Sequence, residues 1–282
     1  VVNAEAEILG VFPRTPRGES WQKVIKEATR ALTQARTDCG KDAELEHRRG
    51  KYKTGTDGWS IGGGQREPMQ LVEKTVRAKK AVRALLDNQA VKDIAGFGNN
   101  CLKTYAPDLY AYYETTKAKI GEQLPHLKPS FTNSVFAGVT FNLGPKTVTY
   151  GHRDHQNIPF GWCCVTALGD FDDTKGGHVI LWDLKLVIRV PAGASYLIPS
   201  AILKHSNVDI GAEETRMSVT QYSAGGLFRW VACGMRSQAV YEREGNRLPS
   251  GQDRWNEGVA LLRKWSGNHA KPVPDHIDNA ET

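Results

Sequence analysis

From residue 131 to residue 235 the sequence consists of short runs of β-branched and aromatic residues, separated by Gly, Pro, Asp and Asn. Strands this short and closely spaced are typical of a β-sandwich or barrel, because a parallel βαβ fold needs a helix between successive strands. This part of the chain therefore predicts an antiparallel β structure. The runs lie at residues 135–142, 146–151, 162–168, 177–183, 186–190, 194–198, 203–208, 216–222 and 227–232.

The first half of the chain has helical periodicity instead. Apolar residues recur every three or four positions over 20–37, where Ser20 would cap the helix, and over 68–86, where Pro68 would lie in the first turn. The basic, glycine-rich residues 41–66 predict a long loop or hairpin. Further helices are expected over 90–104, 107–122 and 251–266.

These patterns predict an α+β protein, a double-stranded β-helix (jelly roll) buttressed by N-terminal helices. We expect one catalytic unit: helical support with the loop 41–66 in residues 1–125, the β core in 126–235, and a C-terminal helix and tail in 236–282. A Walker A loop or dinucleotide fingerprint is not expected, because the three glycines at 62–64 have the wrong spacing and no Gly-Lys-Ser/Thr follows.

Charge and composition narrow the class of partner. The net charge of +6 and the pI of about 9.0 favour a polyanion, although a solubilising surface explains them equally well. The five cysteines form no Cys-x-x-Cys pair, so we do not expect a zinc ribbon. No apolar run is long enough to cross a bilayer, so we expect a soluble protein without a membrane-spanning segment.

The segment from Gly151 to Asn157 contains a His-x-Asp motif. In a strand, residues i and i+2 face the same side, so His152 and Asp154 can point at one metal ion. Two histidines and a carboxylate form the facial triad of non-haem iron(II) oxygenases, and His205 in a later strand is the best candidate for the second histidine. His155 and His178 compete with it. An extended strand turns His155 to the opposite face, and a structural histidine is the default for His178.

An Arg-x-Ser pair follows His205 by eleven residues. Arg216 and Ser218 would share one face of a strand, where the planar guanidinium offers a bidentate site for a carboxylate and the hydroxyl adds a donor. The order of these motifs points to the distal carboxylate of 2-oxoglutarate as the ligand. The alternative is a surface ion pair of Arg216 with Glu213 or Glu214.

The motifs and their order resemble the TET/JBP type of 2-oxoglutarate dioxygenase, in particular the fungal branch that is often associated with transposable elements. The resemblance covers residues from about 58 to 235. It rests on Gly62-Gly63-Gly64-Gln65-Arg66-Glu67-Pro68, Thr140-Phe141-Asn142-Leu143-Gly144-Pro145, His152-Arg153-Asp154, Phe160-Gly161-Trp162-Cys163, Gly176-Gly177-His178, Ile198-Pro199-Ser200, Glu214-Thr215-Arg216 and Ala224-Gly225-Gly226-Leu227-Phe228-Arg229-Trp230.

This resemblance implies oxidation of methyl groups on DNA bases, with Fe(II) and 2-oxoglutarate as cofactors. It implies iron ligands at His152, Asp154 and His205, and a 2-oxoglutarate site at Arg216 and Ser218 with Asn142. The methylated base would be flipped out of double-stranded DNA, as a buried site requires. The resemblance also implies a monomer that acts in the nucleus.

The same resemblance implies how the base is held. Asn157 would hydrogen-bond the base edge and Tyr222 would stack on its ring. Where animal TET enzymes have a histidine that contacts cytosine, this chain has Ala224. The preferred base therefore stays open between 5-methylcytosine and N6-methyladenine. Phosphates would be gripped by the basic residues 47–53 and by Gly63, Gly64 and Arg66.

Two alternatives remain open, and a third is disfavoured. The first is a 2-oxoglutarate hydroxylase that acts on RNA or on a protein side chain. The second is a transposon-derived DNA-binding protein that has lost catalysis. The third, a cupin-type metal protein, is disfavoured because its paired His-x-His motif is absent.

Overall fold

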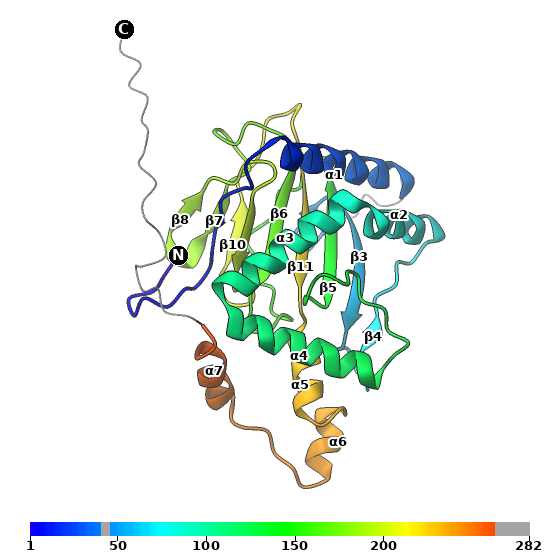
Figure 1. Ribbon diagram of the computed structural model, residues 1–282, viewed down its shortest axis with the longest axis vertical. Helices are drawn as coiled ribbons and strands as arrows, with labels where there is room; N and C mark the ends of the chain where they lie inside the picture. The colour runs from blue at the N-terminus through cyan, green and yellow to red at the C-terminus, as the bar shows by residue number, and fades with distance from the viewer. Residues whose placement is uncertain (41–45, 263–282) are drawn as a thin grey trace.

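The computed structural model describes residues 1–40 and 46–262, in which a large antiparallel sheet carries helices on one face (Figure 1). The sheet has six strands in the order β4-β3-β5-β11-β6-β9, and all neighbouring pairs are antiparallel. The strands are β3 (Lys53–Ser60), β4 (Met69–Gln70), β5 (Gly138–Gly144), β6 (Cys163–Asp170), β9 (Ser195–Ile198) and β11 (Thr215–Tyr222).

A second, three-stranded sheet has the order β10-β7-β8, and an isolated bridge between His152 and His205 extends its β10 edge. Its strands are β7 (Val179–Leu181), β8 (Leu186–Ile188) and β10 (His205–Asn207), with the 3-10 turn η2 (Trp182–Leu184) between the first two. Residues of this sheet pack against the inner face of the large sheet, in a cluster that includes Val179, Cys163 and Tyr196. Two packed antiparallel sheets of this kind confirm the predicted jelly roll.

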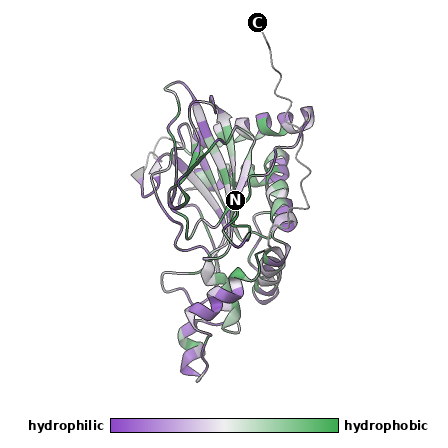
Figure 2. Cartoon of the chain, turned by 90° about the vertical axis from the view of Figure 1, so that its left-hand side faces the viewer, coloured by the Kyte–Doolittle hydropathy of each residue, from purple (hydrophilic) through white to green (hydrophobic). Residues whose placement is uncertain are grey.

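The helices cover the outer face of the large sheet. Met217 and Val219 of β11 pack with residues of α1, α2 and α3, whereas Ser218 and Thr220, one step along the strand, belong to the inner face. The helices are α1 (Glu19–Asp38), α2 (Val76–Asp87), α3 (Gln89–Tyr105) and α4 (Pro107–Gln123). In the side view, strands and helices form two layers (Figure 2).

Three shorter helices follow the last strand: α5 (Gly225–Ala232), α6 (Gln238–Arg243) and α7 (Gly251–Val259). Phe228 of α5 lies against α4, with its ring centroid 5.0 Å from that of Tyr112 and 5.0 Å from that of Tyr113. No helix among the described residues is both long and apolar enough to cross a membrane.

Residues 41–66 were expected to form a long loop or hairpin, and residues 41–45 lie outside the described part. The structure confirms a hairpin and adds a strand that was not expected. A two-stranded hairpin, β1 (Glu46–His47) and β2 (Gly50–Lys51), is followed by β3, which pairs with β5 of the large sheet. The expected helix over 68–86 begins late, because residues 69–70 pair with β3 and Thr75 caps α2. The cap at Ser20 is wrong, since α1 begins after Gly18 without a side-chain cap.

Two expected strands are absent from their positions. Residues 146–151 form only an isolated bridge, since their backbone hydrogen bonds are divided among Arg49, Asn207 and Arg216. Residues 227–232 belong to helix α5, because Leu227, Phe228 and Trp230 together bury one helical face. A short apolar run does not distinguish a strand from a buried helix by periodicity alone.

Candidate functional site

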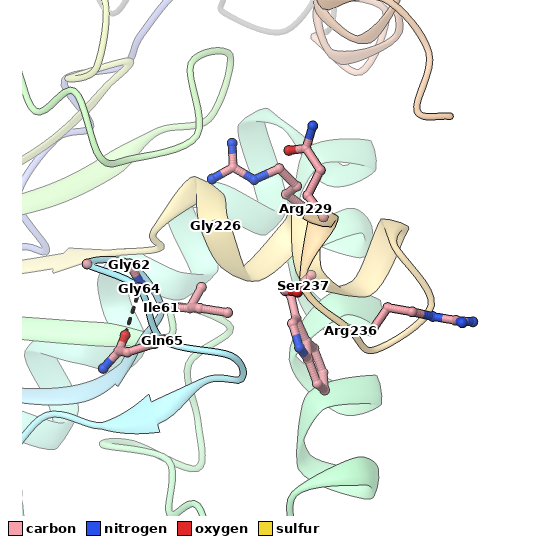
Figure 3. Close-up of a pocket in the computed structure, with 11 residues that line it drawn as sticks. Ile61, Gly62, Gly64, Gln65, Gly226, Arg229, Arg236 and Ser237 are labelled. Atoms are coloured by element: carbon pink, nitrogen blue, oxygen red, sulfur yellow. Dashed lines mark hydrogen bonds between the residues drawn. The ribbon is translucent and has the colours of Figure 1, made fainter. Parts of the chain in front are cut away.

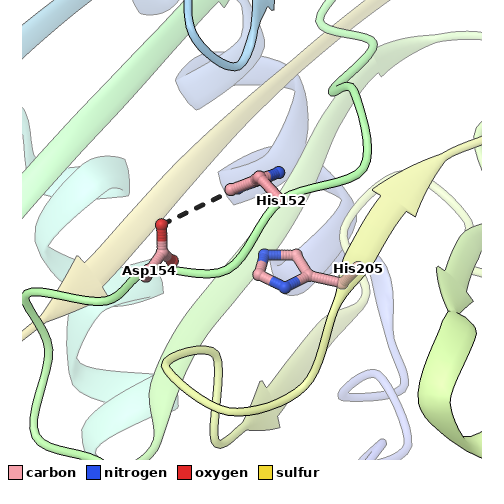
Figure 4. A group of neighbouring side chains, drawn as sticks. All are labelled: His152, Asp154 and His205. Atoms are coloured by element: carbon pink, nitrogen blue, oxygen red, sulfur yellow. Dashed lines mark ion pairs between the residues drawn. The ribbon is translucent and has the colours of Figure 1, made fainter.

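Backbone pairing places the two histidines opposite each other. The N–H of His152 donates to the carbonyl of His205 at 3.0 Å, and the N–H of His205 donates back to His152 at 2.9 Å. Their ring centroids are 4.3 Å apart. The expected strand around His152 is therefore reduced to this single bridge, yet the bridge brings both rings to one side (Figure 4).

Asp154 completes the cluster from the loop that leaves the bridge. Its N–H donates to the carbonyl of Ser200 at 2.9 Å, and its Oδ1 lies 3.7 Å from His152 Nε2. The ligand atoms of His152, Asp154 and His205 all lie within 4.8 Å of one another. Asp154 is 7% exposed, so this carboxylate is held in the interior beside two imidazoles.

The tautomer of each histidine follows from a backbone contact. Nδ1 of His152 lies 2.7 Å from the carbonyl of Tyr150, and Nδ1 of His205 lies 2.9 Å from that of Leu203. A carbonyl oxygen can only accept, so Nδ1 of each neutral ring carries the proton and Nε2 presents a lone pair. Burial, followed by the charge of His205, lowers the pKa of His152 to about 4, and burial also lowers the pKa of His205. Both rings are neutral at physiological pH, as metal ligation requires.

The competing histidines do not join this cluster. His155 is exposed, and His178 is a half-buried residue outside the group that can hold a metal. Within residues 1–40 and 46–262, the cluster of His152, Asp154 and His205 is the one group of three such side chains close enough to share an ion.

An arginine that was expected to lie near DNA contacts the cluster instead. Nη2 of Arg49, in the β1–β2 turn, is 2.6 Å from Oδ1 of Asp154. The two groups form an ion pair, but their orientation does not satisfy the geometry of a hydrogen bond. Lys53 likewise turns inward and donates to the carbonyls of Arg36 and Gly40 at the end of α1. Arg48 is exposed, so the basic run 47–53 divides between the interior and the surface.

Arg216 is buried on the inner face of the large sheet, at 1% exposure. Its Nη1 donates to the carbonyl of Thr147 at 2.8 Å, whereas Nε and Nη2 have no hydrogen-bond partner among the described residues. The alternative of a surface ion pair is excluded, because Arg216 is buried and the described residues form no ion pair between it and Glu213 or Glu214. A buried guanidinium with two unpaired donors is a site for an anionic ligand.

Ser218 and Asn142 stand opposite each other on neighbouring strands of the same face. Nδ2 of Asn142 donates to Oγ of Ser218 at 2.8 Å and reaches Oγ1 of Thr220 at 3.4 Å. Because Oγ of Ser218 accepts this bond, its own proton is free to be donated to a ligand beside Arg216.

Sequence reasoning did not identify two buried tyrosines, Tyr52 and Tyr196, which are 4% and 3% exposed. Burial raises the pKa of Tyr52 to about 12 and raises that of Tyr196 further, and both phenols feel the charges of Asp154 and Arg216. Thr147, whose carbonyl accepts from Nη1 of Arg216, lies in the same segment as His152, so this segment links the guanidinium to the metal cluster. Nothing in the sequence spacing marked Tyr52 or Tyr196, because Tyr52 lies between β2 and β3, Tyr196 lies in β9, and neither belongs to the His-x-Asp or Arg-x-Ser motif.

The residues expected to hold a base lie on the adjoining wall. Nδ2 of Asn157 donates to Oγ of Ser200 at 3.1 Å, and its backbone pairs with Ala224. The ring of Tyr222 crosses the sheet above Gly138, where an added Cβ would lie 3.2 Å from Tyr222 Cζ. The structure thus brings Asn157, Ala224 and Tyr222 together at the end of β11.

The expected phosphate contacts lie at the surface, outside the metal cluster. Gly63 and Gly64 form an exposed turn after β3, with φ values of 57° and 89°. Arg66 is exposed beyond them and does not line the pocket that this turn borders.

Comparison with known proteins gives structural likenesses only: no family profile matches the sequence, and no curated protein does so either. The chain is similar to NgTET1 in complex with 5mC DNA, with 16% identity, 78% of this chain and 74% of that chain covered, and a TM-score of 0.48. It is also similar to the viral collagen prolyl hydroxylase vCPH from Paramecium Bursaria Chlorella virus-1 in its 2OG complex, with 12% identity, coverage of 79% and 99%, and a TM-score of 0.35.

A third similar structure is an oxidoreductase of the 2OG-Fe(II) oxygenase family from Burkholderia pseudomallei, with 15% identity, coverage of 75% and 94%, and a TM-score of 0.36. Likenesses this distant carry no conclusion about activity. The assignment of the jelly roll rests on the strand order of this chain, and the chemistry of the site rests on its own side chains.

The side chains fit Fe(II) and 2-oxoglutarate. Two neutral imidazoles and one carboxylate form the donor set that non-haem iron(II) takes when it keeps open coordination positions. Across the same interior, the unpaired nitrogens of Arg216 and the hydroxyl of Ser218 suit a carboxylate.

Proposed function

We propose that this protein is an Fe(II)- and 2-oxoglutarate-dependent dioxygenase that oxidises methyl groups on DNA bases. The observation that carries the proposal is the cluster of His152, Asp154 and His205 together with a buried Arg216, of which two nitrogens have no hydrogen-bond partner among the described residues. A metal cluster alone fits many enzymes. The guanidinium adds the recognition of a dicarboxylate cosubstrate.

Each residue has a stated task in this proposal. His152, Asp154 and His205 hold the iron, and Arg216 and Ser218 bind the distal carboxylate of 2-oxoglutarate, with Asn142 fixing the orientation of the serine. When bound, iron and 2-oxoglutarate supply the oxidising power that inserts oxygen from O2 into a C–H bond. The protein positions the cofactors and excludes water from the buried site.

The substrate class rests on the sequence resemblance to TET/JBP-type enzymes and on the wall beside the metal cluster. Asn157 offers amide groups to the edge of a base, and Tyr222 offers a ring on which a flipped base can stack. A base inside a duplex does not reach a buried site, so the nucleotide must leave the stack. The net charge of +6 favours binding of the DNA backbone.

Mass spectrometry of nucleosides tests the proposal. Duplexes with 5-methylcytosine or N6-methyladenine, matched RNA and a set of peptides are incubated with the protein, Fe(II), 2-oxoglutarate and O2. We expect an oxidised or demethylated nucleoside from at least one methylated duplex. The identity of the methylated base that reacts shows which base the site prefers with Ala224 in place of a histidine.

The alternatives give different results in the same experiment. Activity confined to peptides or to RNA would show that the protein is a hydroxylase of those substrates and not a DNA oxidase. A protein that bound DNA but formed no succinate with any substrate would be the catalytically silent DNA-binding protein.

A further inference from the structure

A pocket outside the metal cluster lies between the glycine turn after β3 and helices α5 and α6 (Figure 3). Its volume is about 360 Å³, at the lower end of the range of roughly 300–1,000 Å³ for ligand sites. The lining residues include no Asp or Glu. They are Ile61, Gly62, Gly63, Gly64, Gln65, Gly226, Arg229, Trp230, Arg236, Ser237 and Gln238.

Hydrogen-bond donors without partners are concentrated in this lining. The backbone N–H groups of Gly63 and Gly64 make no hydrogen bond within the described residues, and both glycines have positive φ. Successive N–H groups in such a turn form a concave site for anions. Trp230 is 3% exposed, and its indole N–H, a donor only, has no acceptor in the described structure.

The two arginines of the lining differ in their availability. Arg236 donates to the carbonyl of Cys233 and pairs with Glu244, and its side chain extends away from the glycine turn (Figure 3). Arg229 is exposed at the rim, and its side chain forms no hydrogen bond or ion pair within residues 1–40 and 46–262. The pocket thus keeps one uncompensated positive charge.

The pocket adjoins the wall that holds Asn157. Ala224 pairs with Asn157, and the next residue, Gly225, donates its N–H to the carbonyl of Gln156 at 2.8 Å. Gly226 then packs on the glycine turn so closely that an added Cβ would lie 2.8 Å from Ile61 Cγ2. One residue of α5, Gly225, therefore lies between Ala224 of the base wall and Gly226 of the pocket lining.

We infer that this pocket binds a backbone phosphate of the nucleic-acid strand that enters the metal site. An acid-free lining, unpaired backbone and indole donors, and a free Arg229 together suit a phosphodiester, which is an anion with accepting oxygens. The position next to Asn157 places this phosphate beside the nucleotide that is extruded. That the phosphate belongs to a DNA strand rests on the proposed function.

The test measures DNA binding without turnover. Metal-free protein is titrated onto a fluorescent 20-base-pair duplex carrying one 5-methylcytosine, at salt concentrations from 50 to 200 mM. The variants are Trp230→Phe, which removes the indole N–H and keeps the aromatic ring, and Arg229→Gln. Arg243→Gln is the matched control, because Arg243 is an exposed arginine of α6 outside the pocket.

We expect Trp230→Phe to weaken duplex binding about tenfold, because a hydrogen bond to a charged oxygen is lost. Arg229→Gln should reduce the slope of log K against log salt by about 0.9, the value for one phosphate contact, and Arg243→Gln should leave it unchanged. Wild-type affinity and slope in both pocket variants, or a wild-type protein that binds no duplex, would overturn the inference. Nucleoside oxidation is measured separately, so a failure of the pocket is distinguishable from a failure of the proposed function.

Discussion

The Asp154→Asn and His205→Ala variants should lose turnover completely while remaining folded. Each substitution removes one of three bonds to the metal, and Asn keeps the size of Asp while its neutral amide is a weak ligand. Changing a group that merely supports a ligand typically reduces metal affinity 10- to 100-fold, so loss of a ligand itself should exceed about 100-fold. Both side chains are buried, at 7% and 8% exposure, so the melting temperature of each variant is measured beside its turnover.

Calorimetric titration with Mn(II) under anoxic conditions, together with the melting temperature, separates loss of metal from loss of fold. His155→Ala is the matched control, since it removes an exposed histidine three residues from His152. We expect the control to bind metal like the wild type. Normal metal binding and activity in Asp154→Asn or His205→Ala would show that the ligand assignment is wrong.

The second large effect is expected at Arg216, where Arg216→Ala should raise the KM for 2-oxoglutarate by at least about 100-fold. Two nitrogens of the guanidinium are free for the distal carboxylate, and hydrogen bonds to charged groups contribute roughly 1.5–3 kcal/mol each. Arg216→Lys should recover part of the affinity, because a lysine keeps the charge but not the planar fork. Metal binding should persist in both variants.

Arg153→Ala is the matched control for this prediction, because Arg153 forms a half-exposed ion pair with Asp183 away from the interior. Steady-state KM values and titration of 2-oxoglutarate onto the Mn(II)-loaded protein check the result. An unchanged KM in Arg216→Ala would mean that another group binds the carboxylate.

The sequence predicted the metal cluster because its chemistry is local. His152 and Asp154 are two residues apart, and the order of His205 and Arg216 after them restricted the alternatives to a few residues. The expectation that a regular strand would bring the two histidines together was wrong. A single backbone bridge between His152 and His205 does so instead. Arg49, Tyr52 and Tyr196 were missed, because their proximity to the site depends on pairing between distant segments.

The fold was predicted well where one face of an element is buried. Helix α1 has its apolar residues on one side and was expected within two residues of its observed bounds. Strand β3 was missed, because Lys, Thr, Asp and Gly dominate its sequence and it is recognisable only by pairing with β5. Helix α5 was taken for a strand, because its side chains are aromatic or β-branched and its helical face is apparent only against α4.

The pocket beside α5 was not apparent in the sequence for a related reason. The glycine turn suggested contact with phosphates, but the residues that complete the pocket belong to α5 and α6, more than 150 residues later. Arg66, which is next to the turn in sequence, does not line the pocket. The sequence therefore identified the glycine turn, but not the residues of α5 and α6 that form the pocket with it.

The central claim is that 2-oxoglutarate is consumed in order to oxidise a methylated DNA base. The most direct measurement is the yield of succinate and of modified nucleoside in one reaction, with a methylated duplex and with an unmethylated duplex of identical sequence. The account predicts that the methylated duplex stimulates succinate formation and that each oxidation event is matched by one succinate. Equal succinate from both duplexes with no modified nucleoside would contradict it.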